Sequence, residues 1–254
     1  MKDYKTLAET IYKRKSTREF SKTTADILEN DVDLVKAFDI QPLIDSIKVN
    51  VKVLRKGEVN NGRSDYCIAF YSEEKPHYLE NIGFIGQQID LELQARGLGT
   101  CWWGMKKPSG KYKNIEGLSC VITMAAGCPR TTEKRTYPDG FKRNAIGGIF
   151  AGTLPDSRDS VPFRLIEAVR IAPSAVNLQP WIIKRIDNEY IFYLRPPKAL
   201  MEKMIKGLRY IDMGIAMAHF MVQAKTDGLE VSFNFEGEDT DHGKFVASVL
   251  TTAG

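Results

Sequence analysis

Two long apolar stretches, separated by about half of the chain, constrain the fold more than any other feature of this sequence. Residues 78–95 and 205–224 both place apolar side chains at helical spacing, and a Gln-Ala pair recurs near the end of each, at Gln94 and Gln223. Each predicted helix follows strand-like runs, ends near a glycine and precedes a further strand. A pattern that repeats at half of the chain length predicts two related units, each built around one of these helices.

The composition indicates a globular protein without a nucleic-acid or membrane partner. Of the 254 residues, 43% are hydrophobic and 27% charged, and the net charge of +4 comes from scattered residues. No apolar run approaches the ~20 residues of a membrane span. Four cysteines without a C-x-x-C pair argue against a zinc site or a disulfide framework and favour the cytoplasm. We therefore expect an α+β protein of two half-domains, residues 1–150 and 151–254, with mixed or antiparallel sheets.

The segment Ala172–Trp181 (Ala-Pro-Ser-Ala-Val-Asn-Leu-Gln-Pro-Trp) joins an apolar helical run to an apolar strand-like run. Pro173 ends the helix, because its ring disfavours helical geometry at the residue before it. Ser174 and Asn177 can then turn hydrogen-bonding groups outward. A stiff polar loop held at both ends by core segments suits a small-molecule site, although an ordinary helix-to-strand connector is the alternative.

A cationic run, Arg14-Lys15-Ser16-Thr17-Arg18, follows the predicted first helix over residues 4–12. If the run is extended, Arg14, Ser16 and Arg18 point to one side. Forked guanidinium donors and a hydroxyl match a phosphate group. The alternative is a solvated helix end, where cations suit the carboxyl-terminal dipole.

The loop and the cationic run resemble two motifs of the FMN-dependent nitroreductases. The loop matches the flavin-contacting loop of that family at six positions: Pro173, Ser174, Asn177, Gln179, Pro180 and Trp181. The cationic run matches a family pattern Arg-Arg/His-Ser-x-Arg/Lys, with Lys15 as a conservative departure. The resemblance implies a nitroreductase-like fold that binds FMN through Arg14, Lys15, Ser16, Arg18, Pro173, Ser174, Ala175 and Asn177.

Two further segments are candidates for contact with the flavin. The glycines of Gly97–Gly104 have the wrong spacing for a dinucleotide fingerprint. The resemblance instead implies that the backbone of Trp103 and Gly104 approaches the flavin ring, while a buried aromatic pair is the alternative. It also implies a late basic pair near the phosphate, either Lys142-Arg143 or Lys134-Arg135, unless both pairs are solvated loop charges.

Ordinary nitroreductases are dimers in which one subunit supplies the cationic residues and the other supplies the Pro-Ser-x-x-Asn loop. Here the first half has the cationic run, but its loop counterpart, Phe38–Pro42, keeps only Gln-Pro. The second half has the loop, but the counterpart of the cationic run is degenerate around Ser157-Arg158. The resemblance therefore implies the fused branch of the family, with one complete site in a monomeric pseudo-dimer or a weak homodimer.

The resemblance implies a ping-pong oxidoreductase in which NAD(P)H reduces FMN and a small-molecule acceptor, such as a nitroaromatic or a quinone, is reduced next. The cofactor carries the chemistry, so no protein acid or nucleophile is required. Arg18 near the pyrimidine edge would stabilise the charge of the reduced flavin. The alternatives are another FMN enzyme on the same scaffold, or a degenerate-site flavin- or small-molecule-binding protein without reductase activity.

Overall fold

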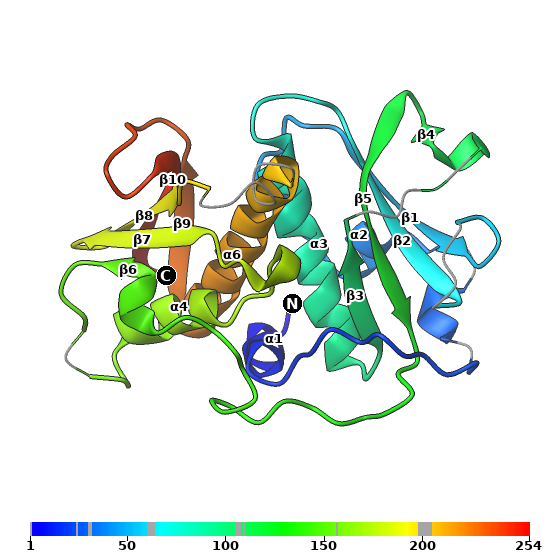
Figure 1. The fold of residues 1–254 in the computed structure, drawn as a ribbon, viewed down its shortest axis with the longest axis horizontal. Coiled ribbons are helices and arrows are strands. Elements are labelled where there is room, and N and C mark those ends of the chain that lie inside the picture. The colour runs from blue at the N-terminus through cyan, green and yellow to red at the C-terminus, as the bar shows by residue number, and fades with distance from the viewer. Residues whose placement is uncertain are drawn as a thin grey trace.

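The computed structural model describes residues 2–23, 25–29, 32–59, 64–104, 108, 110–155, 157–197 and 205–254. Two five-stranded sheets lie at opposite ends of the molecule, with helices α3 and α6 between them (Figure 1). The first sheet has the order β1-β2-β5-β3, with β4 paired to β5, and the second has the order β6-β7-β8-β10-β9. This arrangement confirms the predicted α+β class.

The strands of the first sheet are all antiparallel; in chain order they are β1 (Val49–Arg55), β2 (Tyr66–Ser72), β3 (Gly99–Trp103), β4 (Asn114–Ile115) and β5 (Leu118–Gly127). The second sheet is antiparallel except for the parallel pair β6–β7. Its strands are β6 (Phe150–Ala151), β7 (Trp181–Ile186), β8 (Glu189–Leu194), β9 (Leu229–Asn234) and β10 (Lys244–Ala253). Both sheets are therefore mixed or antiparallel, as predicted.

The two central helices, α3 (Tyr78–Ala95) and α6 (Lys206–Thr226), cross at a pair of glycines. A Cβ added to Gly83 would lie 2.1 Å from the carbonyl oxygen of Ile211, and one added to Gly214 would lie 1.9 Å from that of Glu80. Only glycine allows backbones to approach so closely. The contact is reciprocal, because each glycine touches the residue three positions before the other.

Helices α1 and α4 begin where the sequence predicts. Helix α1 (Tyr4–Ile11) is capped by Asp3, which accepts a hydrogen bond from the Thr6 backbone N–H. Helix α4 (Val161–Arg170) is capped by Ser160 and has proline in its first turn. This helix delivers the chain to the loop that begins at Pro173, so its start and end fix where that loop lies.

The apolar residues between Ile27 and Phe38 predict one short helix, and this prediction is wrong. Ile27–Phe38 does not form one helix, because Asp33 accepts from the backbone N–H groups of Val35 and Lys36 and starts a separate helix, α2 (Leu34–Ala37). A 3₁₀ turn, Asp26–Leu28, precedes it. Strand β10 was not predicted, although it lies between β8 and β9.

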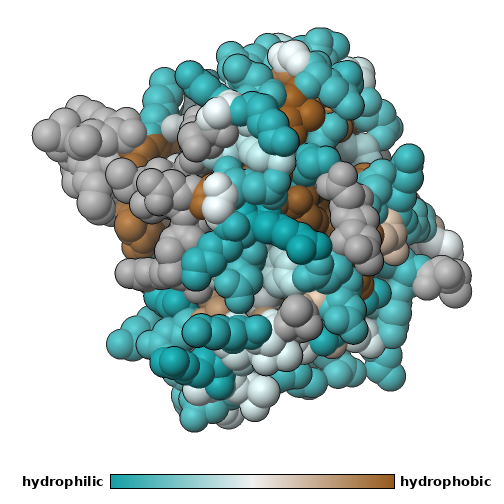
Figure 2. Space-filling view, turned by 90° about the vertical axis from the view of Figure 1, so that its right-hand side faces the viewer, coloured by the Kyte–Doolittle hydropathy of each residue, from teal (hydrophilic) through white to brown (hydrophobic). Residues whose placement is uncertain are grey.

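One hydrophobic cluster runs through the helices and the facing sides of both sheets, and a smaller one covers the outer side of the first sheet. Figure 2 shows the end of the molecule where the first sheet lies; its coloured surface is mostly hydrophilic, with hydrophobic residues in small separate spots. Within the described residues, none of the helices is both long enough and apolar enough to span a membrane.

Candidate functional site

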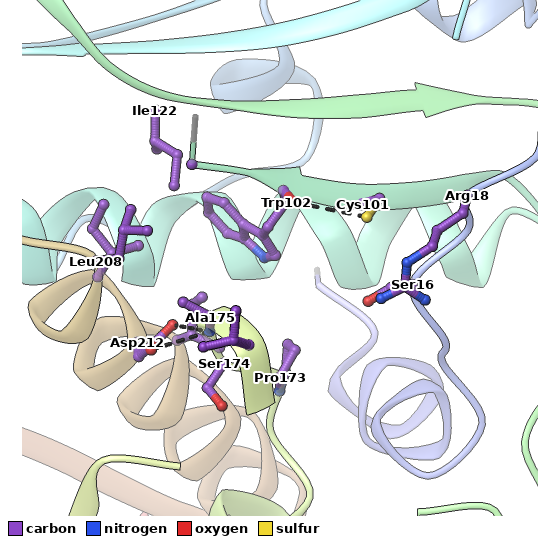
Figure 3. A pocket seen from close by; sticks show the side chains of 14 residues that line it. Ser16, Arg18, Cys101, Trp102, Ile122, Pro173, Ser174, Ala175, Leu208 and Asp212 are labelled. Atoms are coloured by element: carbon purple, nitrogen blue, oxygen red, sulfur yellow. Dashed lines mark hydrogen bonds between the residues drawn. The ribbon is translucent and has the colours of Figure 1, made fainter. Parts of the chain in front are cut away.

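A pocket between α6 and the first sheet brings the cationic run and the Ala172–Trp181 loop together (Figure 3). It encloses about 150 Å³. Ser16 and Arg18 line it from one side and Pro173–Val176 from the other. The remaining wall comes from β3 and its end, from β5 and from α6: Cys101, Trp102, Gly104, Ile122, Leu208, Ile211, Asp212 and Ile215. The two segments that were predicted to face one ligand therefore share a cavity.

The cationic run is extended but does not point all its donors to one side. Its backbone pairs with β3, since the Thr17 N–H donates to the Thr100 carbonyl at 2.8 Å. Ser16 and Arg18 reach the pocket, whereas Arg14 turns into the core. The Lys15 side chain points neither into the pocket nor into the core; its Nζ atom lies 3.8 Å from a carboxylate oxygen of Glu133.

Arg14 forms a buried ion pair with Asp90 of α3. The Arg14 Nε atom lies 2.8 Å from Asp90 Oδ2, and both side chains are 1% exposed. The same carboxylate accepts hydrogen bonds from Thr100 Oγ1, from Gln94 Nε2 at 2.9 Å and from Gln87 Nε2 at 2.7 Å. A carboxylate with this many donors is well satisfied in the core and fixes the guanidinium beside it.

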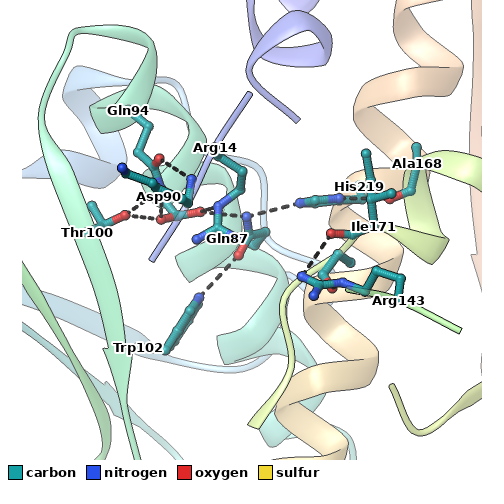
Figure 4. Close-up of polar contacts among 12 residues, drawn as sticks. Arg14, Gln87, Asp90, Gln94, Thr100, Trp102, Arg143, Ala168, Ile171 and His219 are labelled. Atoms are coloured by element: carbon teal, nitrogen blue, oxygen red, sulfur yellow. Dashed lines mark hydrogen bonds and ion pairs between the residues drawn. The ribbon is translucent and has the colours of Figure 1, made fainter. Parts of the chain in front are cut away.

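Gln87 extends this network to the pocket wall and to α6 (Figure 4). Its Oε1 accepts from the indole N–H of Trp102 at 3.2 Å, and its Nε2 lies 3.1 Å from His219 Nε2. His219 Nδ1 lies 2.9 Å from the Ala168 carbonyl, so Nδ1 donates and Nε2 accepts. Burial lowers the pKa of His219 to about 3, so the ring is neutral. The network therefore holds Trp102 in one orientation.

An arginine cluster, defined here as Arg14, Arg18, Arg135 and Arg143, lies beside the pocket. Burial, and then the charges of Arg14 and Arg18, lower the pKa of Arg135. Burial, followed by the charges of Arg135, Arg14 and Arg170, lowers the pKa of Arg143. In each of the two basic pairs, Lys134-Arg135 and Lys142-Arg143, the arginine is partly buried and the lysine is exposed.

Three buried donors of the arginine cluster have no hydrogen-bond partner among the described residues, and one of them, Arg14 Nε, is in the ion pair with Asp90. Arg14 Nη2 and Arg135 Nη1 are both buried and unpaired. A guanidinium has no acceptor atoms, so these donors can be satisfied only by an acceptor from outside the described chain. Mutually repelling cations with free buried donors favour an anion, and a phosphate group has the matching geometry.

Arg143 also ties the loop to the preceding helix. Its guanidinium donates to the Asn177 Oδ1 atom at 2.7 Å and to the carbonyls of Ile171 and Ala172 at 3.3 Å and 3.1 Å. The Asn177 amide in turn donates to the Lys142 carbonyl at 3.0 Å. Neither the Arg143 nor the Asn177 side chain lines the pocket, so both hold the loop in place without forming part of the pocket wall.

The loop is held in a strained conformation. Val176, Asn177 and Gln179 have φ angles of +44°, +60° and +50°, which are unfavourable for a β-branched residue above all. Ser174 Oγ accepts from the Gln179 backbone N–H at 2.9 Å, and Gln179 Oε1 accepts from the Asn144 backbone N–H at 2.7 Å. Such strain persists only where surrounding contacts over-determine it, and it concentrates at functional sites.

Replacing Val176 by asparagine is expected to raise the free energy of unfolding by about 1 kcal/mol, because asparagine tolerates left-handed backbone and valine does not. Thermal or denaturant unfolding measures the change. Leu250→Asn is the control: Leu250 is an exposed apolar residue, like Val176, but its φ angle is negative. An equal gain in both variants would show that lost surface hydrophobicity, not relieved strain, is the cause.

Asp212 of α6 is the acidic pocket residue that sequence reasoning missed. It is 3% exposed, and its two carboxyl oxygens lie 3.0 Å and 3.1 Å from the Ala175 backbone nitrogen. Burial raises the pKa of Asp212 to about 8, opposed by the Ala175 N–H and the charge of Arg209. An acid within the otherwise apolar run Ile211–Ile215 was the available signal.

The segment after α3 forms β3, and the strand decides which tryptophan faces the pocket. Trp102 and Gly104 line it, while Trp103 does not. A Cβ on Gly104 would lie 2.7 Å from a methyl carbon of Leu208, so glycine keeps this corner open. Of the remaining predicted residues, Ser16, Arg18, Pro173, Ser174 and Ala175 line the pocket, whereas Arg14, Lys15, Lys142, Arg143 and Asn177 do not.

Two sheets flank paired central helices, and a pocket lies between α6, β3 and the segment that carries Ser16 and Arg18. These features define an α+β protein with the nitroreductase fold. The chain belongs to the family whose model is described as "Putative TM nitroreductase", which matches residues 6–224. No curated protein matches the sequence.

Solved structures of nitroreductases resemble the chain over different lengths. A putative nitroreductase from Thermotoga maritima MSB8 has 22% identity and a TM-score of 0.64, and the match covers 96% of this chain and 93% of that one. A putative nitroreductase in complex with FMN from Desulfovibrio desulfuricans has 15% identity and a TM-score of 0.38, with 59% and 98% covered. A nitroreductase family protein from Clostridium novyi NT has 19% identity and a TM-score of 0.36, with 49% and 86% covered.

Proposed function

We propose that this protein is an FMN-dependent oxidoreductase of the nitroreductase type, which takes electrons from NAD(P)H and passes them to a nitroaromatic, a quinone or a similar small acceptor. One observation carries the proposal. The cationic segment and the Pro-Ser-Ala loop, far apart in sequence, line one pocket beside an arginine cluster with free buried donors. Membership of the nitroreductase family and an FMN complex in a solved relative support it.

The residues present fit FMN. The unpaired donors of Arg14 and Arg135 suit its phosphate, and Ser16 adds a hydroxyl on the pocket side. The wall of the pocket is largely apolar and includes Trp102, which suits the flat ring system. Bound FMN would supply hydride transfer between the nicotinamide and the acceptor.

The chain's own residues would orient the cofactor and tune its charge. Arg18 lines the pocket and is exposed, so its cation can stabilise negative charge that develops on a bound ring. The buried pair of Arg14 with Asp90 fixes the guanidinium before any ligand arrives, which lowers the cost of ordering it. The strained loop is fixed in the same way by Asp212 and Arg143.

We further infer that the chain consists of two related halves with one cofactor site. The offset in sequence between the crossing glycines, Gly83 and Gly214, equals the offset between Gly104 and Phe235. Phe235 is therefore the counterpart of Gly104, which lies at the open corner of the pocket. Phe235 packs against His77 with ring centroids 4.8 Å apart, and Phe233 packs against Phe84 at 5.5 Å. Aromatic side chains thus occupy the place that corresponds to the pocket, which favours one FMN per chain.

Replacing Arg135 by methionine is expected to weaken FMN binding about 10- to 100-fold, the effect of losing one or two charge-assisted hydrogen bonds. Methionine retains apolar contact with Phe141, over whose ring the guanidinium lies at 4.9 Å. Fluorescence titration of the apoprotein with FMN gives the dissociation constant. Arg130→Met is the matched control, because Arg130 lies on the same segment but is exposed.

The spectrum of the purified protein tests the function itself. A flavin absorbance that bleaches with NADH or NADPH and returns with a quinone supports a reductase. A colourless protein that takes up no added FMN would refute the proposal and favour a binding protein with a degenerate site. Equal FMN affinity in Arg135→Met and the wild type would remove Arg135 from the phosphate site.

A further inference from the structure

The pocket contains one carboxyl group among the lining residues that the structure describes. Its polar side chains are Ser16, Arg18, Cys101, Ser174 and Asp212. Arginine stays protonated throughout the accessible pH range, so Arg18 cannot release a proton. The Cys101 thiol donates to the Trp102 carbonyl at 3.7 Å. Asp212 is therefore the candidate for acid–base work in a cavity where a small acceptor is proposed to be reduced.

The carboxyl group of Asp212 faces the loop that forms the opposite wall (Figure 3). One backbone donor, the Ala175 N–H, reaches it, at 3.0 Å and 3.1 Å from its two oxygens. The charged side chain that acts on it is Arg209, one turn earlier in α6, whose guanidinium donates to the Arg195 carbonyl. Arg18 and Cys101 are the other titratable groups that line the same cavity.

A carboxyl group is not needed to hold such a loop. In the other half, Asn81 of α3 does the same with an amide, because its Oδ1 accepts from the backbone N–H groups of Leu43 and Ile44 at 2.8 Å and 3.1 Å. Asn81 and Asp212 are separated in sequence by the same number of residues as the crossing glycines, and so are Ile44 and Ala175. What Asp212 adds beyond this shared role is an exchangeable proton on a side chain that lines the pocket.

We propose that Asp212 is the catalytic acid that protonates the reduced acceptor, an inference that rests on the proposed function. The acceptor is an electrophile with a hydrogen-bond-accepting oxygen, such as a quinone. Bound FMN would supply the two electrons as a hydride. The O–H bond of Asp212 breaks, its proton bonds to the acceptor oxygen, and the electron pair stays on the carboxylate. Solvent then returns a proton to Asp212.

The protonation state of the free protein agrees with this role. Because burial raises the pKa of Asp212 to about 8, the carboxyl group carries a proton at neutral pH and can donate a hydrogen bond. A general acid works best when its pKa lies near the working pH. The same group at its ordinary pKa would be ionised, and it would repel the negative charge that develops on the acceptor oxygen during reduction.

Asp212→Asn is the test, since asparagine keeps the acceptor for the Ala175 N–H, as Asn81 does for Ile44. We expect the rate at which a quinone reoxidises the reduced enzyme to fall about 100-fold, within the usual contribution of a general acid. The FMN dissociation constant should change less than twofold. The wild-type rate should decline above a pH near 8, and the residual rate of the variant should not follow that profile.

A second measurement needs no turnover. Infrared difference spectra of the wild-type protein at pH 6 and pH 10 should show a protonated-carboxyl band that the Asp212→Asn variant lacks. Asp212→Ala, which removes the loop contact as well, should weaken FMN binding and so separates positioning from proton donation.

The outcomes distinguish the two proposals. A wild-type protein that binds no FMN refutes the proposed function, whatever the infrared result. A wild-type protein that turns over, with equal reoxidation rates and pH profiles in Asp212→Asn, overturns the role of Asp212 alone. A missing carboxyl band in the wild type would do the same, because the group would then be ionised.

Discussion

Replacing Gly214 by valine is expected to lower the free energy of unfolding by about 4 kcal/mol or more, a large part of the total stability of a typical domain. The site has no room for a side chain, since even a Cβ would lie 1.9 Å from the Glu80 carbonyl oxygen. The obstacle is backbone of a packed helix, so no rotamer change relieves it. The helices must separate, which loosens the core between both sheets and the pocket wall carried by α6.

Gly207→Val on the same helix is the control for the Gly214 prediction. The nearest atom to a Cβ there is a methyl carbon of Leu79 at 3.8 Å, an ordinary van der Waals contact. Valine is slightly better than glycine inside a helix, so this variant should change stability by less than about 0.5 kcal/mol. Chemical denaturation measures both. A Gly214→Val protein within about 1 kcal/mol of the wild type would contradict the close crossing of α3 and α6.

The long central helices could be predicted well from the sequence. Helix α3 was predicted over the residues that it occupies, because apolar side chains recur at helical spacing and Gly97 follows its end. Strand β10 was not predicted from the sequence, because an acidic stretch precedes it and Ser248, Thr251 and Thr252 interrupt its apolar pattern. Its β-branched content was a usable signal.

Only the parts of the candidate site that belong to local sequence motifs could be predicted. The loop and the cationic run carry recognisable residues, and both line the pocket. Which way each side chain turns depends on distant partners: Asp90 draws Arg14 into the core, and the pairing of Trp102 with Met124 sets which tryptophan faces inward. Asp212 was missed for the same reason, since its role depends on the Ala175 N–H.

The second large effect is expected from Asp90→Ala, which should lower the free energy of unfolding by about 3–5 kcal/mol, because it leaves the buried Arg14 guanidinium without a counter-charge. The donors of Thr100, Gln94 and Gln87 lose their acceptor as well. Glu9→Ala is the control. The Glu9–Lys13 pair is about half exposed on each side, and such pairs contribute less than about 1 kcal/mol.

A double variant, Arg14→Met with Asp90→Leu, separates the structural role of the pair from its proposed role toward FMN. Replacing both charges by apolar groups removes the uncompensated cation, so at least about half of the stability lost in Asp90→Ala should return. FMN affinity should stay low, because the free Nη2 donor of Arg14 is gone. If the double variant regains stability and also binds FMN like the wild type, Arg14 has no part in holding the phosphate. If it is less stable than Asp90→Ala, the ion pair and its donors form a unit that apolar packing cannot replace.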